Sequence, residues 1–488
     1  MREYLHFIDN SRRAASDGRT VAVVEPATGE PFALIARGNA RDVDLAVAAA
    51  RRAIDGERTG LPFRGAWGRF AAAERGRLLA RLSAAVAANQ DELAELESRD
   101  TGKPMRQARA DALALARYFE FYAGAADKLH GQTLPYQNGY TVLTLREPHG
   151  VTGHIIPWNY PMQIFGRSVG AALAAGNACV VKPAEDACLS LLRVAELAAQ
   201  CDLPAGALNI VTGLGAEAGQ ALAEHPGIDH ISFTGSGPTG ERVSNAAAAH
   251  CCPVTLELGG KSAQVVFADA DLDAAVPVIV NAIIQNCGQT CSAGSRVLVA
   301  RERQDELAER LGAAFKALVT DTPQADADLG PLINARQRDR VSSFLAQAER
   351  DGLPVLATGR LADGLPANGY YQPAVLLGRV PIGHAVAQQE VFGPVLAMTP
   401  FEHEDDAIAL ANATPYGLVA GVWTADGARQ MRMARAVRTG QVFINNYGAG
   451  GGVELPFGGM KHSGFGREKG FEALYGFTTL KTIAVRHD

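Results

Sequence analysis

The sequence predicts an α/β fold built on parallel sheets, in a chain of 488 residues. From about residue 150, short apolar runs alternate with amphipathic stretches at intervals of about 20–30 residues, the length of a strand and a returning helix. Hydrophobic residues make up 47% of the chain and charged residues 20%, which is typical of a globular protein with a large core and excludes a mainly disordered one. At about 150 residues per domain, the length corresponds to about three domains.

The first part of the chain is predicted to be helical and the next part to form a parallel sheet. Leu78, Leu82 and Val86 recur every four residues, which predicts helix from about 71 to 124. Thr101–Gly102–Lys103–Pro104 interrupts it, because Gly and Pro break helices. The strands expected in the sheet are residues 151–156, 178–181, 208–212, 230–233 and 254–258.

A second alternating block, from about 262 to 459, predicts a second α/β unit. Its expected strands include residues 295–300, 395–400, 421–424 and 442–445. Two more strand-like segments, 140–146 and 479–485, lie outside any strand–helix–strand unit. Such exposed strands usually pair with something, often with another subunit.

Charge and cysteine content narrow the class of protein. The chain has 46 basic and 52 acidic residues, and this mildly acidic balance disfavours non-specific binding to nucleic acid. No apolar run is long enough to span a membrane, and the N-terminus has no apolar signal core. Seven cysteines with no CxxC pair predict reduced thiols rather than a disulfide framework. We therefore expect a cytoplasmic protein that binds neither nucleic acid nor membrane.

One glycine-rich turn has the pattern of a dinucleotide-binding site. Residues 235–240 read GSGPTG, follow a predicted strand and open a predicted helix at 238–249. Helix N-termini bind phosphate, and the acid about 20 residues further on, Glu257, would then hold a ribose. In a chain with 52 glycines, a tight turn that simply needs glycine explains the pattern equally well.

Cys291 is the candidate nucleophile among the seven cysteines. It lies in a polar, glycine-bearing run, residues 286–296, where a thiol can ionise and meet a substrate. Cys179 and Cys251 lie in Ala-rich surroundings that suit packing better. Cys287 forms a CxxxC pair with Cys291, but no histidine cluster accompanies it. A redox switch or metal site is therefore disfavoured, and no metal is expected.

Seven motifs, in order along the chain, resemble those of the NAD(P)-dependent aldehyde dehydrogenase superfamily, of the hydrolytic, non-acylating type. The resemblance covers essentially the whole chain. The motifs are PWNYP at 157–161, KPAE at 182–185, FTGS at 233–236, LELGGKS at 256–262, QTCSAGSR at 289–296, EVFGP at 390–394 and PFGG at 456–459.

The resemblance implies a reaction and assigns four catalytic residues. An aldehyde would be oxidised to a carboxylic acid through a thiohemiacetal and a thioester on Cys291. Asn159 would stabilise the oxyanion, and Glu257 would be the general base rather than a ribose ligand. Glu468 would assist proton handling, although a structural salt bridge at this position would look the same in the sequence.

The resemblance also implies NAD as the cofactor, with NADP possible. Glu185, three residues after Lys182, takes over the ribose role, and its carboxylate would repel the 2′-phosphate of NADP. The implied cofactor-binding residues are Ile156, Pro157, Trp158, Lys182, Glu185, Gly215, Thr234, Gly235, Ser236, Leu258, Glu390 and Phe392.

For the substrate, the resemblance points to Tyr160, Ile164, Arg167 and Phe457. Arg167 lies where some relatives that oxidise semialdehydes or aromatic aldehydes carry arginine, so it could pair with a substrate carboxylate. A structural salt bridge is an equally open explanation. The chain has Gln285 where succinate-type semialdehyde enzymes often have a second arginine, and this difference weakens the case for a substrate of the succinate semialdehyde type.

The implied domains are a Rossmann-like NAD-binding domain (1–126 and 149–259), a catalytic domain (260–462) and oligomerisation strands (127–148 and 475–488). A homodimer or homotetramer is expected. Two alternatives stay open: an acylating enzyme that passes the thioester to coenzyme A, and a non-catalytic binding protein on the same fold. The presence of Glu257 disfavours the first, and the survival of Cys291, Glu257 and Asn159 disfavours the second.

Overall fold

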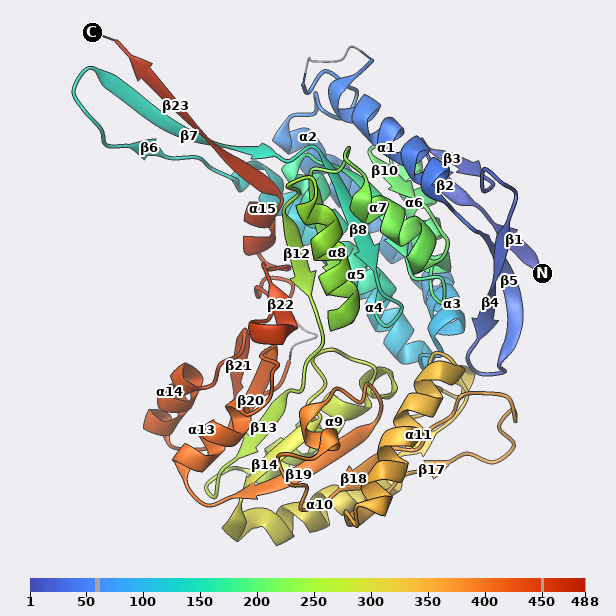
Figure 1. The fold of residues 1–488 in the computed structure, drawn as a ribbon, viewed down its shortest axis with the longest axis vertical. Coiled ribbons are helices and arrows are strands. Elements are labelled where there is room, and N and C mark those ends of the chain that lie inside the picture. The colour runs from blue at the N-terminus through green and yellow to red at the C-terminus, as the bar shows by residue number, and fades with distance from the viewer. Residues whose placement is uncertain (58–61, 449–451, 488) are drawn as a thin grey trace.

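The computed structural model describes residues 1–57, 62–448 and 452–487. It contains two sheet-based units, one above the other in Figure 1, and a narrow three-stranded sheet that projects from the upper unit. The predicted α/β class is therefore confirmed in both halves of the chain.

The first unit is built on an eight-stranded sheet with the order β22-β12-β11-β8-β9-β10-β2-β3. Its five central strands are parallel, and the outer three are antiparallel to their neighbours. All five strands expected from the sequence are present, with ends that differ by at most two residues. The strands are β2 (His6–Ile8), β3 (Ser11–Arg13), β8 (Val151–Ile156), β9 (Ala178–Pro183), β10 (Leu208–Ile210), β11 (His230–Thr234), β12 (Val254–Glu257) and β22 (Gly464–Phe465).

The helical region expected at 71–124 is three helices rather than two. The predicted break at Thr101–Pro104 separates α3 from α4, and a second break at Asn89, which the periodicity does not reveal, separates α2 from α3. Leu78, Leu82 and Val86 are buried, as their spacing predicts. The helices of this unit are α1 (Ala40–Asp55), α2 (Ala72–Ala88), α3 (Gln90–Thr101), α4 (Met105–Ala125), α5 (Pro161–Ala175), α6 (Leu189–Gln200), α7 (Gln220–Glu224), α8 (Gly237–Ala248) and α15 (Glu472–Gly476).

Glycines allow α5 to lie close against α4. A Cβ at Gly166 would be 2.9 Å from the Tyr118 ring, and a Cβ at Gly170 would be 3.1 Å from the Tyr122 ring. Because α5 follows directly after β8, this close packing fixes the chain at the carboxyl end of that strand.

The second unit has a seven-stranded sheet with the order β16-β18-β19-β14-β13-β20-β21, parallel except for β16. The four expected strands are present, whereas the short strands β13, β16 and β18 were not predicted. The elements are β13 (Ala263–Val266), α9 (Leu272–Ile284), β14 (Arg296–Ala300), α10 (Gln304–Ala317), α11 (Ala335–Arg350), β16 (Val355–Thr358), β18 (Val375–Leu377), α12 (Ala385–Gln388), β19 (Val395–Phe401), α13 (Glu404–Asn412), β20 (Val419–Trp423), α14 (Gly427–Ala436) and β21 (Gln441–Ile444).

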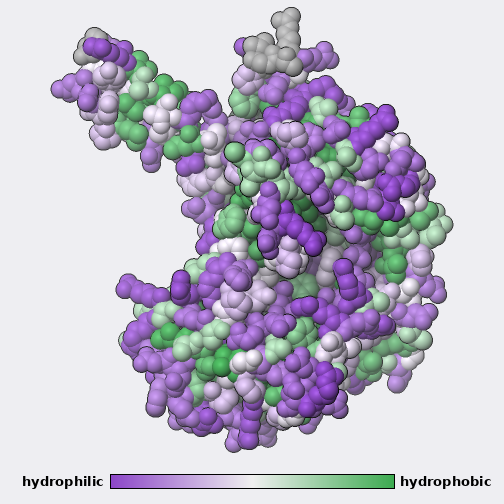
Figure 2. Space-filling model, viewed as in Figure 1, coloured by the Kyte–Doolittle hydropathy of each residue, from purple (hydrophilic) through white to green (hydrophobic). Residues whose placement is uncertain are grey.

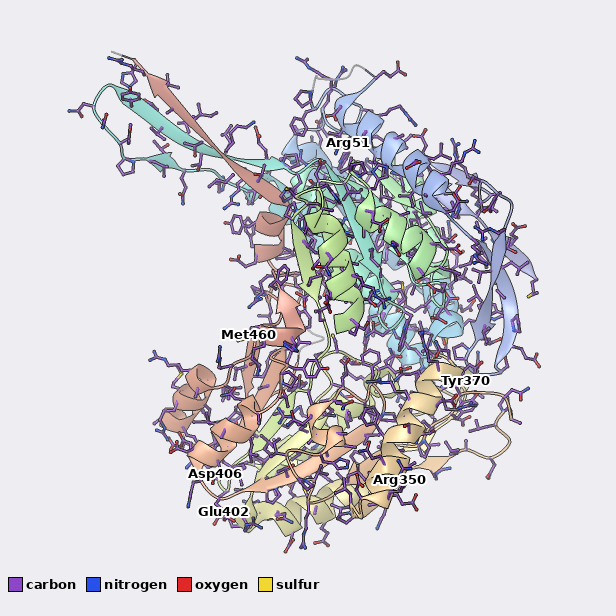
Figure 3. All side chains as sticks on the ribbon, viewed as in Figure 1. Arg51, Arg350, Tyr370, Glu402, Asp406 and Met460 are labelled. Atoms are coloured by element: carbon purple, nitrogen blue, oxygen red, sulfur yellow. The ribbon has the colours of Figure 1, made fainter. Side chains whose placement is uncertain are left out.

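The chain passes between the two sheets beside the predicted chemistry. It leaves the first sheet at Glu257, the end of β12, and enters the second at Ala263. It returns between β21 and β22, and Figure 3 places Met460, on this return, where the two units meet. The carboxyl ends of the first sheet's strands therefore face the second unit, which is where ligands bind in sheets of this kind.

The two strand-like segments outside the α/β units pair with each other. β7 (Tyr140–Pro148) and β23 (Thr478–Arg486) are antiparallel along their whole length, and β6 (Thr133–Leu134) adds to β7. We call this projecting sheet the arm (Figure 1). It exposes Leu134, Leu145, Leu480 and Val485, and hydrophobic residues are visible along it in Figure 2.

Small elements complete the described chain, and no described helix has the length and apolar character that a membrane crossing requires. An N-terminal sheet, which the sequence did not reveal, has the order β1-β5-β4. Its strands are β1 (Arg2–Tyr4), β4 (Thr20–Glu25) and β5 (Glu30–Ala36); the other small strands are β15 (Val319–Thr320) and β17 (Arg360–Leu361), and short helical turns span Ala126–Lys128, Gly215–Gly219, Gln285–Gly288, Arg301–Arg303, Pro323–Ala325 and Lys461–Ser463.

Candidate active site

Cys291 lies on the loop between α9 and β14, in contact with a small apolar cluster. It is half-buried and packs against Leu418, Val419 and Phe457. Burial raises the pKa of the Cys291 thiol to about 12, although the nearby Arg167 charge acts in the opposite direction. The thiol is therefore protonated near neutral pH, and it needs a base before it can act as a nucleophile.

Cys287 does not share this environment. Its sulfur lies in the core of the second unit, 4.0 Å from the backbone oxygen of Gln372. Burial raises the pKa of its thiol well above the ordinary value. The structure gives Cys287 a packing position.

Asn159 connects the loop after β8 to the Cys291 loop. Its side-chain amide donates to the backbone oxygen of Gln289 at 3.0 Å, and its own backbone oxygen accepts from the Asn286 amide at 2.8 Å. Asn159 is buried. An amide nitrogen carries two hydrogens, so Asn159 keeps a second N–H that the bond to Gln289 does not use.

Glu257 is the last residue of β12 and is only 2% exposed. Neither oxygen of its carboxyl has a hydrogen-bond partner in the described structure. Burial raises the pKa of Glu257 well above the ordinary value; Arg167 opposes this and Glu468 adds to it. A Cβ at Gly458 would lie 2.7 Å from Oε1 of Glu257, so glycine there leaves the space that the carboxyl needs.

Glu468 and Arg167 form a buried ion pair next to Glu257. Glu468 also accepts from the hydroxyl of Ser232 at 2.5 Å, and Arg167 donates to the hydroxyl of Thr234 at 3.2 Å. The guanidinium carbon of Arg167 is 4.9 Å from the centre of the Phe457 ring. Arg167 thus forms the structural salt bridge that the sequence analysis kept as one explanation. Because its guanidinium packs on Phe457, Arg167 also lies beside the apolar cluster that Cys291 contacts.

Of the other two predicted substrate residues, Tyr160 contacts the loop of Cys291 and Ile164 lies in the core. The hydroxyl of Tyr160 lies 2.9 Å from the hydroxyl of Thr290, the residue before Cys291. Ile164, one turn further along α5, is buried in the core of the first unit.

A salt bridge between Lys182 and Glu185 lies at the carboxyl end of β9. Lys182 donates to Glu185 at 2.8 Å. Burial acts to raise the pKa of Glu185, but Lys182 and the Gly215 backbone N–H outweigh it, so the pKa is lowered. Glu185 is therefore charged near neutral pH. A Cβ at Gly215 would be 3.9 Å from the Lys182 ammonium.

The remaining predicted cofactor residues lie at the ends of neighbouring strands or on the facing loop of the second unit. Gly235 and Ser236 lead from β11 into α8, and Ile156 ends β8. Trp158 meets Phe392 edge to face, with ring centres 5.4 Å apart. The list is completed by Pro157, which follows β8; Thr234, which ends β11; Leu258, which is buried after β12; and Glu390, which accepts from the Gly260 N–H at 3.0 Å.

These residues fit a dinucleotide. A charged carboxylate suits a ribose diol, the start of α8 suits a pyrophosphate, and the facing aromatic rings suit a flat base. Glycine at 259 keeps the approach to Glu390 open, because a Cβ there would lie 2.5 Å from Oε2 of that carboxyl. In the described residues, no group of three or more His, Cys, Asp and Glu side chains could hold a metal.

Two side chains at the site were not singled out from the sequence. The hydroxyl of Tyr447 donates to the backbone oxygen of Ser292, next to Cys291. The ammonium of Lys103 lies 4.2 Å from the centre of the Tyr160 ring. Lys103 belongs to the helix break at Thr101–Pro104, where an interrupted helix was the only visible signal.

The comparisons with known proteins agree along the whole chain. A family model described as "Aldehyde dehydrogenase family" matches residues 13–483. A curated relative, the hydroxyisobutyraldehyde dehydrogenase of Mycolicibacterium austroafricanum, is 40% identical over 483 residues, covering 99% of this chain and 93% of its own.

Solved structures have the same fold. A crystal structure from Burkholderia cenocepacia, assigned as an aldehyde dehydrogenase, is 68% identical with a TM-score of 0.97, covering 99% of this chain and 100% of its own. PnpE from Pseudomonas sp. WBC-3, crystallised with nicotinamide adenine dinucleotide, is 41% identical with a TM-score of 0.95, covering 99% and 98%. The chain belongs to the aldehyde dehydrogenase family, and it is an NAD-dependent enzyme that oxidises aldehydes.

Proposed function

We propose that Cys291 carries the oxidation through a covalent thiohemiacetal and then a thioester. The observation that supports this most strongly is the convergence of three groups. The loop that bears the Cys291 thiol is bonded to Asn159, and the Glu257 carboxyl acts on the thiol electrostatically. Nucleophile, oxyanion donor and base are the parts that acyl-transfer chemistry needs.

In the first step, the Cys291 proton passes to the Glu257 carboxylate, and the sulfur bonds to the aldehyde carbon. The carbonyl oxygen becomes an oxyanion, which accepts hydrogen bonds from the side chain of Asn159 and from the backbone N–H of Cys291. Losing one such donor typically raises the barrier by about 3–4 kcal/mol.

NAD, when bound, would supply the acceptor for the hydride of the aldehyde carbon. Glu257 releases the Cys291 proton to solvent, so that its carboxylate can take a proton from the water that attacks the thioester on Cys291. The C–S bond breaks, the carboxylic acid leaves, and the sulfur departs as a thiolate that takes the proton held by Glu257. Glu468 assists by its charge, which helps to keep the pKa of Glu257 raised; a base with a raised pKa suits work near neutrality.

The cofactor is proposed to lie across the carboxyl ends of β8, β9 and β11. Lys182 and Glu185 hold the adenosine ribose, with Gly215 beside the adenine. Glu390 holds the nicotinamide ribose, and Phe392 packs near the nicotinamide. The strand-end residues Ile156, Pro157, Trp158, Thr234, Gly235, Ser236 and Leu258 line the rest of the path.

The charge of Glu185 makes cofactor choice testable. Glu185→Gln should narrow the preference for NAD over NADP by about tenfold, because a like-charge repulsion of about 1.4 kcal/mol is lost. The measurement is kcat/KM for both cofactors at one ionic strength. A wild-type preference for NADP, or an unchanged ratio in the variant, would refute the assignment.

The substrate is proposed to be an aromatic aldehyde or a semialdehyde. Tyr160 and Phe457 supply aromatic surface, and Arg167 supplies a positive charge beside Phe457. Ile164 supports this surface from the core of the first unit, against which Tyr160 packs.

Arg167→Ala should raise KM about tenfold or more for acidic aldehydes and much less for neutral ones, because a charge-assisted hydrogen bond to a carboxylate contributes about 1.5–3 kcal/mol. KM for a paired acidic and neutral aldehyde of equal length checks this. Equal effects on both would restrict Arg167 to its pairing with Glu468.

The experiment that tests the function is NADH formation across aliphatic, aromatic and acidic aldehydes, with thiol titration. A product that appears as a coenzyme A thioester only when coenzyme A is added would indicate the acylating alternative. The absence of NADH with every aldehyde would indicate a non-catalytic protein.

The assembly is proposed to be a homodimer or homotetramer formed through the arm. β23 is an outer strand of the arm, and apolar side chains are exposed along it, which suits pairing with a second copy. The proposed domains are residues 1–126 and 149–259 for NAD, 260–462 for catalysis, and 127–148 with 475–488 for assembly. The proposed location is the cytoplasm, with which seven free cysteines are consistent.

A further inference from the structure

A cluster of three buried charges lies behind the start of α5. The ammonium of Lys103 donates to Glu97 at 2.9 Å and is also ion-paired with Asp111. All three residues are at most 3% exposed. Gly102, whose φ is +79°, ends α3 in a left-handed conformation that directs the next residue inward.

Lys103 remains charged in this position. Burial acts to lower its pKa, but Asp111 and Glu97 outweigh burial, and the pKa of Lys103 is raised. Buried ion pairs often stabilise a fold no more than apolar residues of the same size would. The contacts of the cluster are therefore better evidence of its role than its charge alone.

Each member of the cluster contacts the first turn of α5. The ammonium of Lys103 lies 4.2 Å from the centre of the Tyr160 ring, a desolvated cation–π contact. Asp111 accepts from the side chain of Gln163 at 2.5 Å, and Glu97 accepts from the backbone N–H of Met162 at 3.3 Å. Lys103, Asp111 and Glu97 thus hold the N-terminal turn of α5, the helix that follows Asn159.

Tyr160 continues the contact to the nucleophile loop. Its hydroxyl meets the hydroxyl of Thr290 at 2.9 Å, and Thr290 directly precedes Cys291. A second link comes from the same helix as Asp111, because Gln107 of α4 accepts from the backbone N–H of Asn286 at 2.9 Å. Asn286 in turn donates to the backbone of Asn159.

We propose that Lys103 is a positioning residue for the oxidation, acting through the Tyr160 ring to fix Thr290 and Asn159, which both hold the loop that carries Cys291. This rests on the proposed function, in which Cys291 and Asn159 react with the aldehyde. Small displacements at such a site are costly, since about 1 Å can lower a rate by about a hundredfold.

The test combines Lys103→Met, which removes the charge at similar length, with Tyr160→Leu, which removes the ring but leaves the ion pairs in place. Both should lower kcat about tenfold or more, and the double variant should be about as slow as the slower single one, because the two residues act through one contact. KM for NAD should stay within about twofold in each variant. Lys103→Arg, which restores a cation, should recover part of kcat.

A second readout is independent of turnover. The rate at which iodoacetamide alkylates Cys291, followed by mass spectrometry across a range of pH, should change in Lys103→Met and Tyr160→Leu. Because this needs no aldehyde and no cofactor, it separates a failure of this inference from a failure of the proposed function, which would show as a wild-type enzyme that forms no NADH.

Arg75→Met is the matched control. Arg75 is a half-buried cation that donates to the backbone oxygen of Ala174, at the other end of α5. It should lower Tm while leaving kcat and alkylation unchanged. If Lys103→Met does not fold, Tyr160→Leu and Thr290→Val decide the question. Normal kcat and alkylation in those two, or additive losses in the double variant, would overturn the proposal.

Discussion

Replacing Cys291 by serine is expected to lower NADH formation by about three orders of magnitude or more, because the step that forms the covalent bond loses its nucleophile. A serine hydroxyl is far harder to ionise than a thiol, and this site already raises the pKa of the thiol to about 12 by burial. The measurement is kcat/KM with NAD and a good aldehyde, together with electrospray mass of the quenched enzyme, which should show no acyl adduct on the variant.

Cys287→Ser provides the matched control, since it makes the same chemical change four residues away. Cys287 is buried in the apolar core of the second unit, so the variant should lose stability, visible as a lower Tm, while each folded molecule keeps its activity. Normal turnover by Cys291→Ser, or a comparable loss of activity per folded molecule in Cys287→Ser, would contradict the assignment of the nucleophile.

The central strands of the first sheet were predictable because they are buried on both faces. Such strands form continuous apolar runs bounded by turns, and residues 151–156 match β8 end to end. The short strands of the second sheet and of the N-terminal sheet carry a weaker signal. β18 has three residues and β13 has four, and runs of that length occur by chance in a chain with this apolar content.

The candidate site was predictable only where a motif carries it. A thiol in a polar, glycine-bearing loop and a glycine-rich turn after a strand can be read from local sequence. The pairing of Arg167 with Glu468 joins residues about 300 positions apart in the chain, and no local pattern encodes it. The same holds for Lys103, which local sequence shows only as part of a helix break, and whose contact with Tyr160 exists because α4 packs on α5.

Replacing Glu257 by glutamine is expected to slow both proton transfers that the proposal assigns to this carboxyl, because glutamine can take neither the Cys291 proton nor the proton of the hydrolytic water. The steady-state kcat should fall about a hundredfold or more, and NADH should form without a fast burst, because activation of the thiol slows together with hydrolysis. Stopped-flow absorbance at 340 nm measures the time course of NADH formation. Full steady-state turnover by this variant would rule out Glu257 as the base.

The pH dependence gives an independent check on the same residue. Burial raises the pKa of Glu257 well above its ordinary value, and the base works only when deprotonated, so kcat of the wild type should rise with pH through that raised value and the residual kcat of Glu257→Gln should not. Glu468 contributes to the raised pKa, so Glu468→Gln should move the rise to lower pH. An unshifted profile in Glu468→Gln would show that the two carboxyls do not interact.

The same raised pKa predicts that Glu257, the proposed base, lowers the stability of the folded state as pH rises. A carboxyl that holds its proton more tightly when folded favours the folded state most below the unfolded pKa of about 4.3, and this contribution is lost as pH rises through the folded pKa. Glutamine cannot ionise, so Glu257→Gln should gain Tm relative to the wild type as pH rises above about 4.3. If Glu257→Gln is inactive and its Tm exceeds that of the wild type by more as pH rises, the buried carboxyl is kept for its chemistry. A difference in Tm that stays constant across pH would contradict a raised pKa at Glu257.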